Sequence, residues 1–287
     1  MRYEAIAAQQ GGTPTRWLCS ALQVSERSFY DWKRCPESSR SRRDRHLLVA
    51  IKASYERSRC TYGSPRVRLD LRESGLACSR KRVARIMHGN GLVPVQRRRW
   101  KLTTQSGHDL PVQDNLLRRD FTTNGPNRVW LGDITYITTE EGWLYLAALM
   151  DLYSRKIVGW STAERIDRML PLQALDTALQ VRNPPPGLIH HTDRGSQYAA
   201  YEYQRRLEKA HARSSMSRKG DCYDNAPMES FFSTLKRERV HRRRYWTRAE
   251  ATDDLGDYID GFYNLTRRHS ELGGVSPVQY EIMAKLT

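Results

Sequence analysis

Three closely spaced runs of β-branched and aromatic residues most constrain what this chain can fold into. They read "NRVWLGDITYITT" from residue 127, "GWLYLAALMDLYS" from residue 142 and "KIVGWST" from residue 156. Very short gaps around Glu140–Gly142 and Ser154–Arg155 separate these runs. Gaps of this length have room only for tight turns. The pattern predicts three consecutive antiparallel strands.

Helical and strand patterns alternate after these runs. An amphipathic stretch, "RMLPLQALDTALQVR", precedes the apolar run "GLIHHTD", and a second helical stretch, "YEYQRRLEKAH", precedes "ARSSMS". A further helix begins near Pro227. The order β-β-β-α-β-α-β-α predicts an α/β fold, a mixed sheet with helices on its faces.

Charge is divided unevenly along the chain. The 287 residues include 48 Lys and Arg against 32 Asp and Glu, a net charge of +16. Residues 1–110 hold 23 of the basic and 9 of the acidic residues, so nearly all of the excess lies there. A basic front half favours binding of a polyanion, with a well-solvated surface as the alternative.

Cysteine content and hydropathy predict a cytoplasmic protein. The five cysteines are an odd number and show no C-x2-C spacing, which favours reduced thiols over disulfides or a zinc site. No apolar stretch approaches the length of a membrane span, and the N-terminus lacks the apolar core of a signal peptide.

The front half shows two candidate DNA-binding modules. Residues 14–34 form two short helices with a turn at Ser25, either a helix–turn–helix or a purely structural hairpin. In residues 62–92, Ser79 caps a helix that ends near Gly89, and the segment before it is also predicted as helix. That capped helix has an apolar face of Val83, Ile86 and Met87. Its other face carries the predicted DNA contacts Arg80, Lys81, Arg82 and Arg85.

A basic linker follows from about residue 94. It contains "RRRW", which is Arg97, Arg98, Arg99 and Trp100. The arginines could contact the phosphates of a DNA backbone and the tryptophan could stack on a base. A solvated linker without DNA contacts explains the same residues equally well.

Three carboxylates of the back half suit a metal site. Asp133 lies inside the first predicted strand, and Asp193 is the last residue of the fourth predicted strand. An acid in a buried strand is costly unless a cation pairs with it, so two acids on neighbouring strands predict a shared divalent cation. Glu229 lies in the first turn of the last helix, with Lys236 two turns further on and suited to contact a phosphate. The nearby acids Asp221 and Asp224 are interpreted as turn and capping residues.

The spacing of the carboxylates and the sequence motifs around them resemble those of a known family. Thirty-five residues separate Asp193 from Glu229, which looks like the D-35-E signature of retroviral integrases and related transposases. The phrases "WLGDITYI", "HTDRGSQY", "GDCYDNAPMESFFSTLK" and "YNLTRRHSELGGVSP" resemble the second-frame (OrfB) transposases of bacterial insertion sequences of the IS3 family. "YGSPRVRLDLRESGL" and "NLLRRDF" fit the same family. The resemblance covers residues 45–285.

The resemblance implies an RNase H-like catalytic core preceded by small helical DNA-binding modules. It implies that Asp133, Asp193 and Glu229 ligate two Mg²⁺ ions, for which Mn²⁺ substitutes, and that Lys236 is the basic residue after the glutamate. The implied reaction is cleavage at the 3′ ends of the element followed by strand transfer. The implied partners are the transposon ends and target DNA, a homo-oligomer on DNA, and the first-frame (OrfA) protein or a frameshift fusion with it. The resemblance also implies that the protein acts in a bacterial cell and associates with the nucleoid.

The predicted domains are an N-terminal helical segment (1–45), a second helix–turn–helix-like module (46–93), a basic linker (94–124), the catalytic core (125–245) and a C-terminal helical extension (246–287). In that extension Leu255, Tyr258, Ile259, Phe262 and Tyr263 are predicted as core. His190, His191 and Tyr198 receive no role. Two alternatives stay open: an RNase H-like nuclease without strand transfer, and a domesticated DNA-binding regulator without catalysis.

Overall fold

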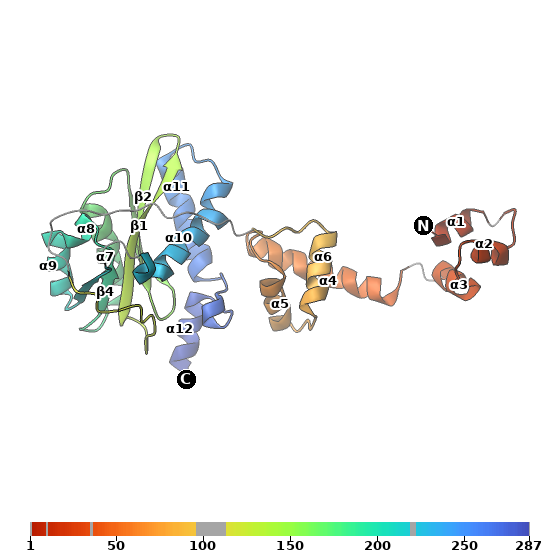
Figure 1. Ribbon diagram of the computed structural model, residues 1–287, viewed down its shortest axis with the longest axis horizontal. Helices are drawn as coiled ribbons and strands as arrows, with labels where there is room; N and C mark the ends of the chain where they lie inside the picture. The colour runs from red at the N-terminus through yellow and green to blue at the C-terminus, as the bar shows by residue number, and fades with distance from the viewer. Residues whose placement is uncertain (1, 10, 35–36, 96–112, 219–221, 287) are drawn as a thin grey trace. The chain divides into compact units, whose positions relative to one another are not determined.

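The computed structural model describes residues 2–9, 11–34, 37–95, 113–218 and 222–286 (Figure 1). The chain divides into two compact units, Met1–Pro94 and Val95–Thr287. The predicted DNA contacts Arg97, Arg98, Arg99 and Trp100 lie outside the described residues, as does Asp221.

The first unit begins with three short helices, α1 (Arg2–Ala8), α2 (Thr15–Ala21) and α3 (Glu26–Arg34). The Ser25 hydroxyl accepts a hydrogen bond from the Ser28 amide at 3.0 Å, so the predicted cap is confirmed. Ile6, Cys19 and Phe29 form a small buried cluster. The sequence prediction missed α1, whose Ile6 joins this cluster.

Three further helices complete the first unit: α4 (Ser39–Arg57), α5 (Ser64–Glu73) and α6 (Arg80–Gly89). The predicted cap of α6 is confirmed, because the Ser79 hydroxyl accepts from the Arg82 amide at 3.2 Å. The boundary predicted between residues 45 and 46 falls inside α4, where no break in the helix occurs.

The apolar alternation of residues 67–71 belongs to helix α5. Val67 and Leu71, one helical turn apart, are buried, whereas Leu69 between them is only half-buried. The turn at Gly63 and a proline in the first helical turn start this helix.

The second unit is built on a five-stranded mixed sheet of order β3-β2-β1-β4-β5. Strands β1 (Val129–Thr139), β2 (Gly142–Asp151) and β3 (Ile157–Ala163) form the predicted antiparallel meander. Strand β4 (Ile189–Thr192) runs parallel to β1, and β5 (Arg213–Met216) runs parallel to β4. The predicted mixed sheet is confirmed.

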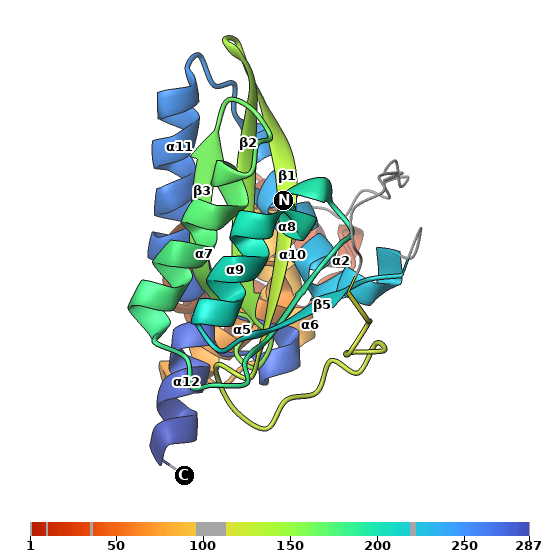
Figure 2. The same cartoon turned by 90° about the vertical axis from the view of Figure 1, so that its left-hand side faces the viewer.

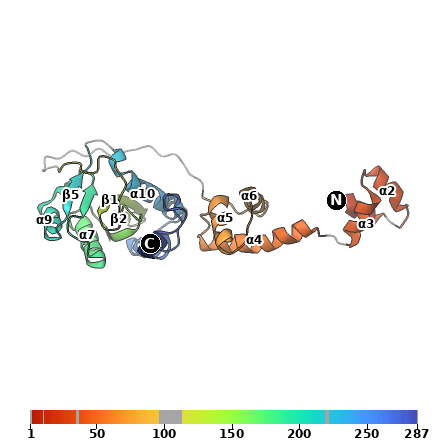
Figure 3. The ribbon, with the colours of Figure 1, turned by 90° about the horizontal axis from the view of Figure 1, so that it is seen from below.

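Helices cover both faces of this sheet. Helices α7 (Met169–Arg182) and α9 (Tyr201–Lys209) lie on one face, and α10 (Ala226–Glu238) and α11 (Arg248–Gly256) lie on the other (Figures 2 and 3). A short helix, α8 (Ser196–Ala199), follows β4.

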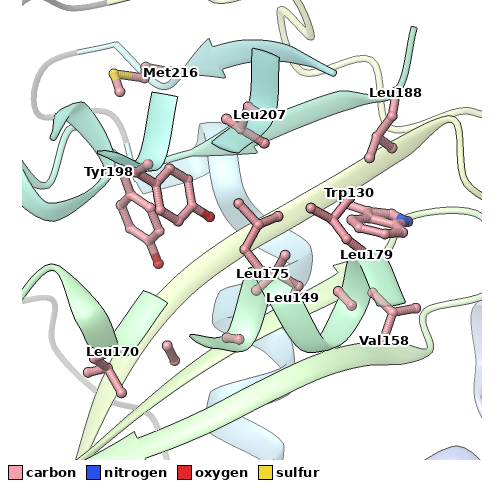
Figure 4. Close-up of a cluster of buried hydrophobic side chains, with 14 of the residues drawn as sticks. Trp130, Leu149, Val158, Leu170, Leu175, Leu179, Leu188, Tyr198, Leu207 and Met216 are labelled. Carbon is pink, nitrogen blue, oxygen red and sulfur yellow. The ribbon is translucent and has the colours of Figure 1, made fainter. Parts of the chain in front are cut away.

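A large apolar core fills the space between the sheet and helices α7 and α9 (Figure 4). Trp130 of β1, Leu149 of β2 and Leu175 of α7 are among its fully buried side chains. Gly159 allows β3 to approach α7, because a Cβ atom there would lie 2.8 Å from the Cβ of Ala178. This packed core fixes the strands that carry the predicted site.

The C-terminal region is also part of the second unit. Helix α11 continues into a π-helical segment, Asp257–Asn264, and α12 (Pro277–Leu286) ends the chain. The predicted apolar stripe is confirmed as core, since each of its five members is buried: Leu255, Tyr258, Ile259, Phe262 and Tyr263.

A buried ion pair binds this region to the rest of the unit, and a buried hydrogen bond supports a turn within it. Arg267 donates to both carboxylate oxygens of Glu238 in α10, at 2.7 and 2.8 Å. Arg268 donates to the Gly274 carbonyl at 2.6 Å. Both arginines are buried, so they act in packing. None of the described helices combines the length and apolar character needed to cross a membrane.

Candidate active site

Strand pairing places the first two carboxylates side by side. The register between the parallel strands β1 and β4 pairs Leu131 with His191. Asp133 and Asp193 each lie two residues beyond this pair, so they stand at the same level of neighbouring strands. This juxtaposition is the one predicted from the sequence.

Backbone amides orient both aspartates. One carboxylate oxygen of Asp133 accepts from the Ile134 amide at 2.8 Å, and one of Asp193 accepts from the Gly195 amide at 2.9 Å. Each carboxylate has a further oxygen, which is the atom type that hard divalent cations prefer.

Helix α10 brings Glu229 to the aspartates. The buried Asn225 side chain, immediately before the helix, donates from Nδ2 to the Gly132 carbonyl of β1 at 3.1 Å. Further along α10, the Lys236 ammonium lies 4.4 Å from the centre of the Tyr136 ring, again on β1. Glu229 lies on α10 between these two attachments, and its charge acts on Asp133.

The carboxylates influence one another electrostatically. Burial raises the pKa of Asp133 well above its usual range, and the charges of Asp193 and Glu229 raise it further. The Ile134 amide and the Lys236 charge oppose these effects. Burial also raises the pKa of Glu229 and lowers the pKa of Lys236, which the Asp133 charge partly restores. The predicted site residues Asp193, Glu229 and Lys236 are therefore close enough to Asp133 for their charges to act on it.

The donor set fits a hard cation. All three groups are carboxylates, and their mutual repulsion is the interaction that a divalent ion between them would remove. No three His, Cys, Asp or Glu side chains in the described part of the chain already stand together at ion-holding distance.

Asp224 has a role that sequence reasoning missed. The prediction made it a turn or cap, but its side chain is fully buried and accepts hydrogen bonds from Asn115, Arg119 and Arg218. Burial alone would raise its pKa, but these hydrogen bonds outweigh burial and lower the pKa of Asp224 to about 2. Apolar residues on both sides of Asp224 and Asn225, Cys222 and Tyr223 before them and Ala226 to Met228 after them, were the available signal of burial. Asp224 thus joins the segment near residue 115 to the start of α10.

The adjacent histidines have structural roles. His190 Nε2 is 2.7 Å from the Tyr203 hydroxyl, and His191 bonds to the hydroxyls of Ser215 and Ser217 at 2.8 and 3.1 Å. Burial lowers the pKa of His190 to about 3 and that of His191 to about 4, so both are neutral at physiological pH. Tyr198 belongs to the apolar core (Figure 4). Its ring centre lies 5.4 Å from that of Tyr203.

The basic face of α6 lies in the first unit. Arg80 and Lys81 are exposed, as a DNA-contacting pair requires. Arg82 and Arg85 donate to Asp44 of α4 at 2.7 and 2.6 Å, so these two of the four predicted contacts also hold α4 to α6.

Comparisons with known proteins agree with this arrangement. Residues 123–222 match the integrase core domain family, residues 229–284 match a second integrase core domain family, and residues 41–100 match an HTH-like domain family. With its mixed sheet, the second unit is therefore an RNase H-like integrase core, and the chain is of the polynucleotidyl transferase class.

Full-length relatives define the family. The IS600 uncharacterized 31 kDa protein of Shigella sonnei is 45% identical over 92% of this chain and 97% of its own length. The InsF transposase for insertion sequence IS3A of Escherichia coli is 41% identical over 98% of both chains. The chain belongs to the IS3 family of insertion-sequence transposases. The catalytic core domain of HTLV-2 integrase in complex with magnesium is a distant structural likeness, with 16% identity and a TM-score of 0.44 over 56% of this chain and 99% of that one.

Proposed function

We propose that this transposase binds the terminal inverted repeats of its insertion sequence, cleaves the 3′ ends and joins them to target DNA. The observation that carries the proposal is the placement of the three carboxylates: the pairing of β1 with β4 brings Asp133 and Asp193 to the same level, and α10, which carries Glu229, is bonded to β1 next to Asp133.

The proposed metal is Mg²⁺, with Mn²⁺ as a substitute and two ions per site. Asp133, Asp193 and Glu229 would hold it, because an all-carboxylate set suits hard cations. A divalent ion bound there would polarise the phosphodiester and lower the pKa of an attacking water.

The chain's own residues orient the substrate. Lys236 places an ammonium beside the carboxylates, where it offsets the charge of a DNA phosphate that would otherwise be repelled. Water attacks the phosphorus, the bond to the 3′ oxygen breaks, and that oxygen leaves as a 3′-OH. The 3′-OH then attacks a target phosphodiester, forms the new joint and displaces a target-strand 3′-OH, which takes up the proton.

The first unit supplies DNA binding in this proposal. Arg80 and Lys81 on α6 face solvent and suit contacts to phosphates. We further propose a homo-oligomer on DNA, cooperation with a first-frame (OrfA) protein or a fusion with it, and association with the nucleoid. The domain limits 1–45, 46–93, 94–124, 125–245 and 246–287 remain part of the proposal, with the first boundary moved to before α4.

A DNA-joining assay tests the proposal. Full-length protein is incubated with Mg²⁺ and duplex DNA carrying the sequence that borders its gene, and the strands are resolved on a denaturing gel. Glu229→Gln should reduce cleavage and joining at least about a thousandfold. Glu208→Gln, at an exposed glutamate of α9, is the matched control and should behave like wild type.

Other outcomes support other functions. Cutting without any joined product would indicate a nuclease. Binding without cutting, which persists after the first-frame protein is added, would indicate a regulator.

A further inference from the structure

Two large aromatic side chains stand exposed on the hairpin that carries Asp133. Tyr136 of β1 is 50% exposed and Trp143 of β2 is 48% exposed. Their ring centres lie 5.0 Å apart, with the planes at 84°. Single exposed aromatics are common on protein surfaces, but a contacting pair is a preformed apolar platform open to solvent. We call Tyr136 and Trp143 the hairpin platform.

Lys236 connects this platform to the carboxylates. Its ammonium lies 4.4 Å from the centre of the Tyr136 ring, and its charge acts on Asp133. One side chain therefore borders both the platform and the proposed cleavage centre. A nucleotide whose phosphate lies at Lys236 would have its base within reach of Tyr136.

The hairpin is held independently of the platform. The Glu140 amide donates to the Tyr245 carbonyl at 3.0 Å, and Arg248 donates to the carbonyls of Glu141 and Trp143 at 2.8 and 3.0 Å. Arg244 also pairs with Glu140 at 2.6 Å. Apart from the Arg244–Glu140 pair, these bonds fix the tip of the hairpin through its backbone atoms, so the two aromatic rings can be removed without removing its supports.

The competing explanation is a cross-strand contact. An aromatic pair on neighbouring strands stabilises a hairpin modestly without any ligand. That explanation accounts for the contact between the rings but not for a cation that both borders them and influences a site carboxylate. An exposed aromatic surface beside a cation has the chemistry that binds unpaired nucleotides, by stacking on the base and neutralising the phosphate.

We propose that an unpaired base at the end of the DNA stacks on one ring of the hairpin platform and packs edge-on against the other, as the 84° between the ring planes requires, while Lys236 contacts the adjoining phosphate. Opening of the terminal base pair would let the phosphodiester enter between the carboxylates. This inference rests on the proposed function, because it specifies the state of the DNA that the same site accepts.

The first test measures base unstacking without cleavage. Full-length protein is mixed, in the presence of EDTA, with a DNA duplex that carries 2-aminopurine in its terminal base pair. The fluorescence of 2-aminopurine rises when it no longer stacks on neighbouring DNA bases, and it is quenched when a protein ring stacks on it. Wild type should change this signal, and Tyr136→Ala and Trp143→Ala should each reduce the change severalfold. Tyr136→Phe, which retains the ring, should behave like wild type. Tyr201→Ala, at a 73% exposed tyrosine of α9, is the control and should also behave like wild type.

The second test measures rescue by a DNA end that is already open. With Mg²⁺, the two alanine variants should cleave a fully paired end about tenfold to a hundredfold more slowly than wild type. They should cleave an end with a mismatched terminal pair within about threefold of wild type, because the opening step is already complete.

The outcomes separate this inference from the proposed function. Equal slowing on paired and mismatched ends would overturn the inference, since it indicates a structural role, and so would no slowing at all. An unchanged 2-aminopurine signal in the alanine variants would also overturn it. Wild type that changes the 2-aminopurine signal but cuts neither DNA would contradict the proposed function and leave stacking supported.

Discussion

At the scale of single residues, the acids of the second unit differ in what acts on their charge. The charges of Asp193 and Glu229 raise the pKa of Asp133, and the charge of Lys236 lowers it. Asp224, in contrast, is satisfied by two arginines and an asparagine. A buried acid that is fully satisfied by protein groups stabilises the fold, whereas acids that repel one another suit the binding of a cation.

Stability should fall in mild acid because of His190. Its folded pKa of about 3 lies below the value near 6.5 of an unfolded histidine. Below about pH 6.5 the unfolded state therefore binds an extra proton at this residue, so His190 should lower the free energy of unfolding by up to about 1.4 kcal/mol per pH unit. His191, whose folded pKa is about 4, should add a second contribution of the same sign. Urea unfolding between pH 7.5 and pH 5 measures this slope.

The variant His190→Gln isolates this contribution. It cannot titrate, so its slope between pH 7 and 5 should be smaller than that of wild type by about one proton. Identical slopes for the two proteins would show that His190 does not remain neutral in the folded state.

At the scale of elements, the position of α10 on β1 decides whether Glu229 meets the aspartates. The Asn225 side chain joins the start of α10 to the Gly132 carbonyl, one residue before Asp133. Asn225 is a positioning residue, since its contact is with the backbone of β1 and the acid it positions lies one turn further on.

Asn225→Ala should affect both stability and turnover. The Gly132 carbonyl would lose its donor within a buried environment, at a cost of about 1–3 kcal/mol. Single-turnover cleavage at saturating protein should slow more than tenfold, while the DNA dissociation constant changes little, because the first unit is unaltered. A variant that loses stability but cleaves at the wild-type rate would show that the bond has no part in positioning Glu229.

Sequence patterns predicted these elements unequally well. The strands, the caps of α3 and α6 and the stripe of the C-terminal helix were predictable because each depends on local residue spacing. The role of Asp224 was not, since its partners Asn115 and Arg119 lie more than 100 residues away in the chain. The pairing of Arg82 and Arg85 with Asp44 was not predictable either, because it depends on how α4 packs on α6. Spacing along the chain predicts which face is buried, but not which distant charge a side chain meets.

At the scale of the whole molecule, DNA binding and chemistry are assigned to different units. Most of the net positive charge lies in residues 1–110, whereas the carboxylates lie in the second unit. Affinity for DNA and the rate of cleavage should therefore respond to different substitutions.

Removing the exposed charges of α6 should weaken binding without altering the chemistry. The double variant Arg80→Ala/Lys81→Ala should reduce the slope of log affinity against log salt by about 2, one unit for each lost phosphate contact. Its cleavage rate at saturating protein should match wild type. The control Arg205→Ala/Lys209→Ala removes the same charge from α9, and equal losses of slope in both variants would contradict a specific role for α6.

The measurement that most directly tests the central claim is strand joining by Asp133→Asn, Glu229→Gln and the combination of the two. Joined product is quantified by amplification across the new joint, so that residual activity remains measurable. Carboxylates that act as one site predict a loss of at least about a thousandfold for each single variant, and nearly the same loss for the double variant. Losses that multiply in the double variant, or an Asp133→Asn protein that retains more than about a tenth of wild-type joining, would contradict the account.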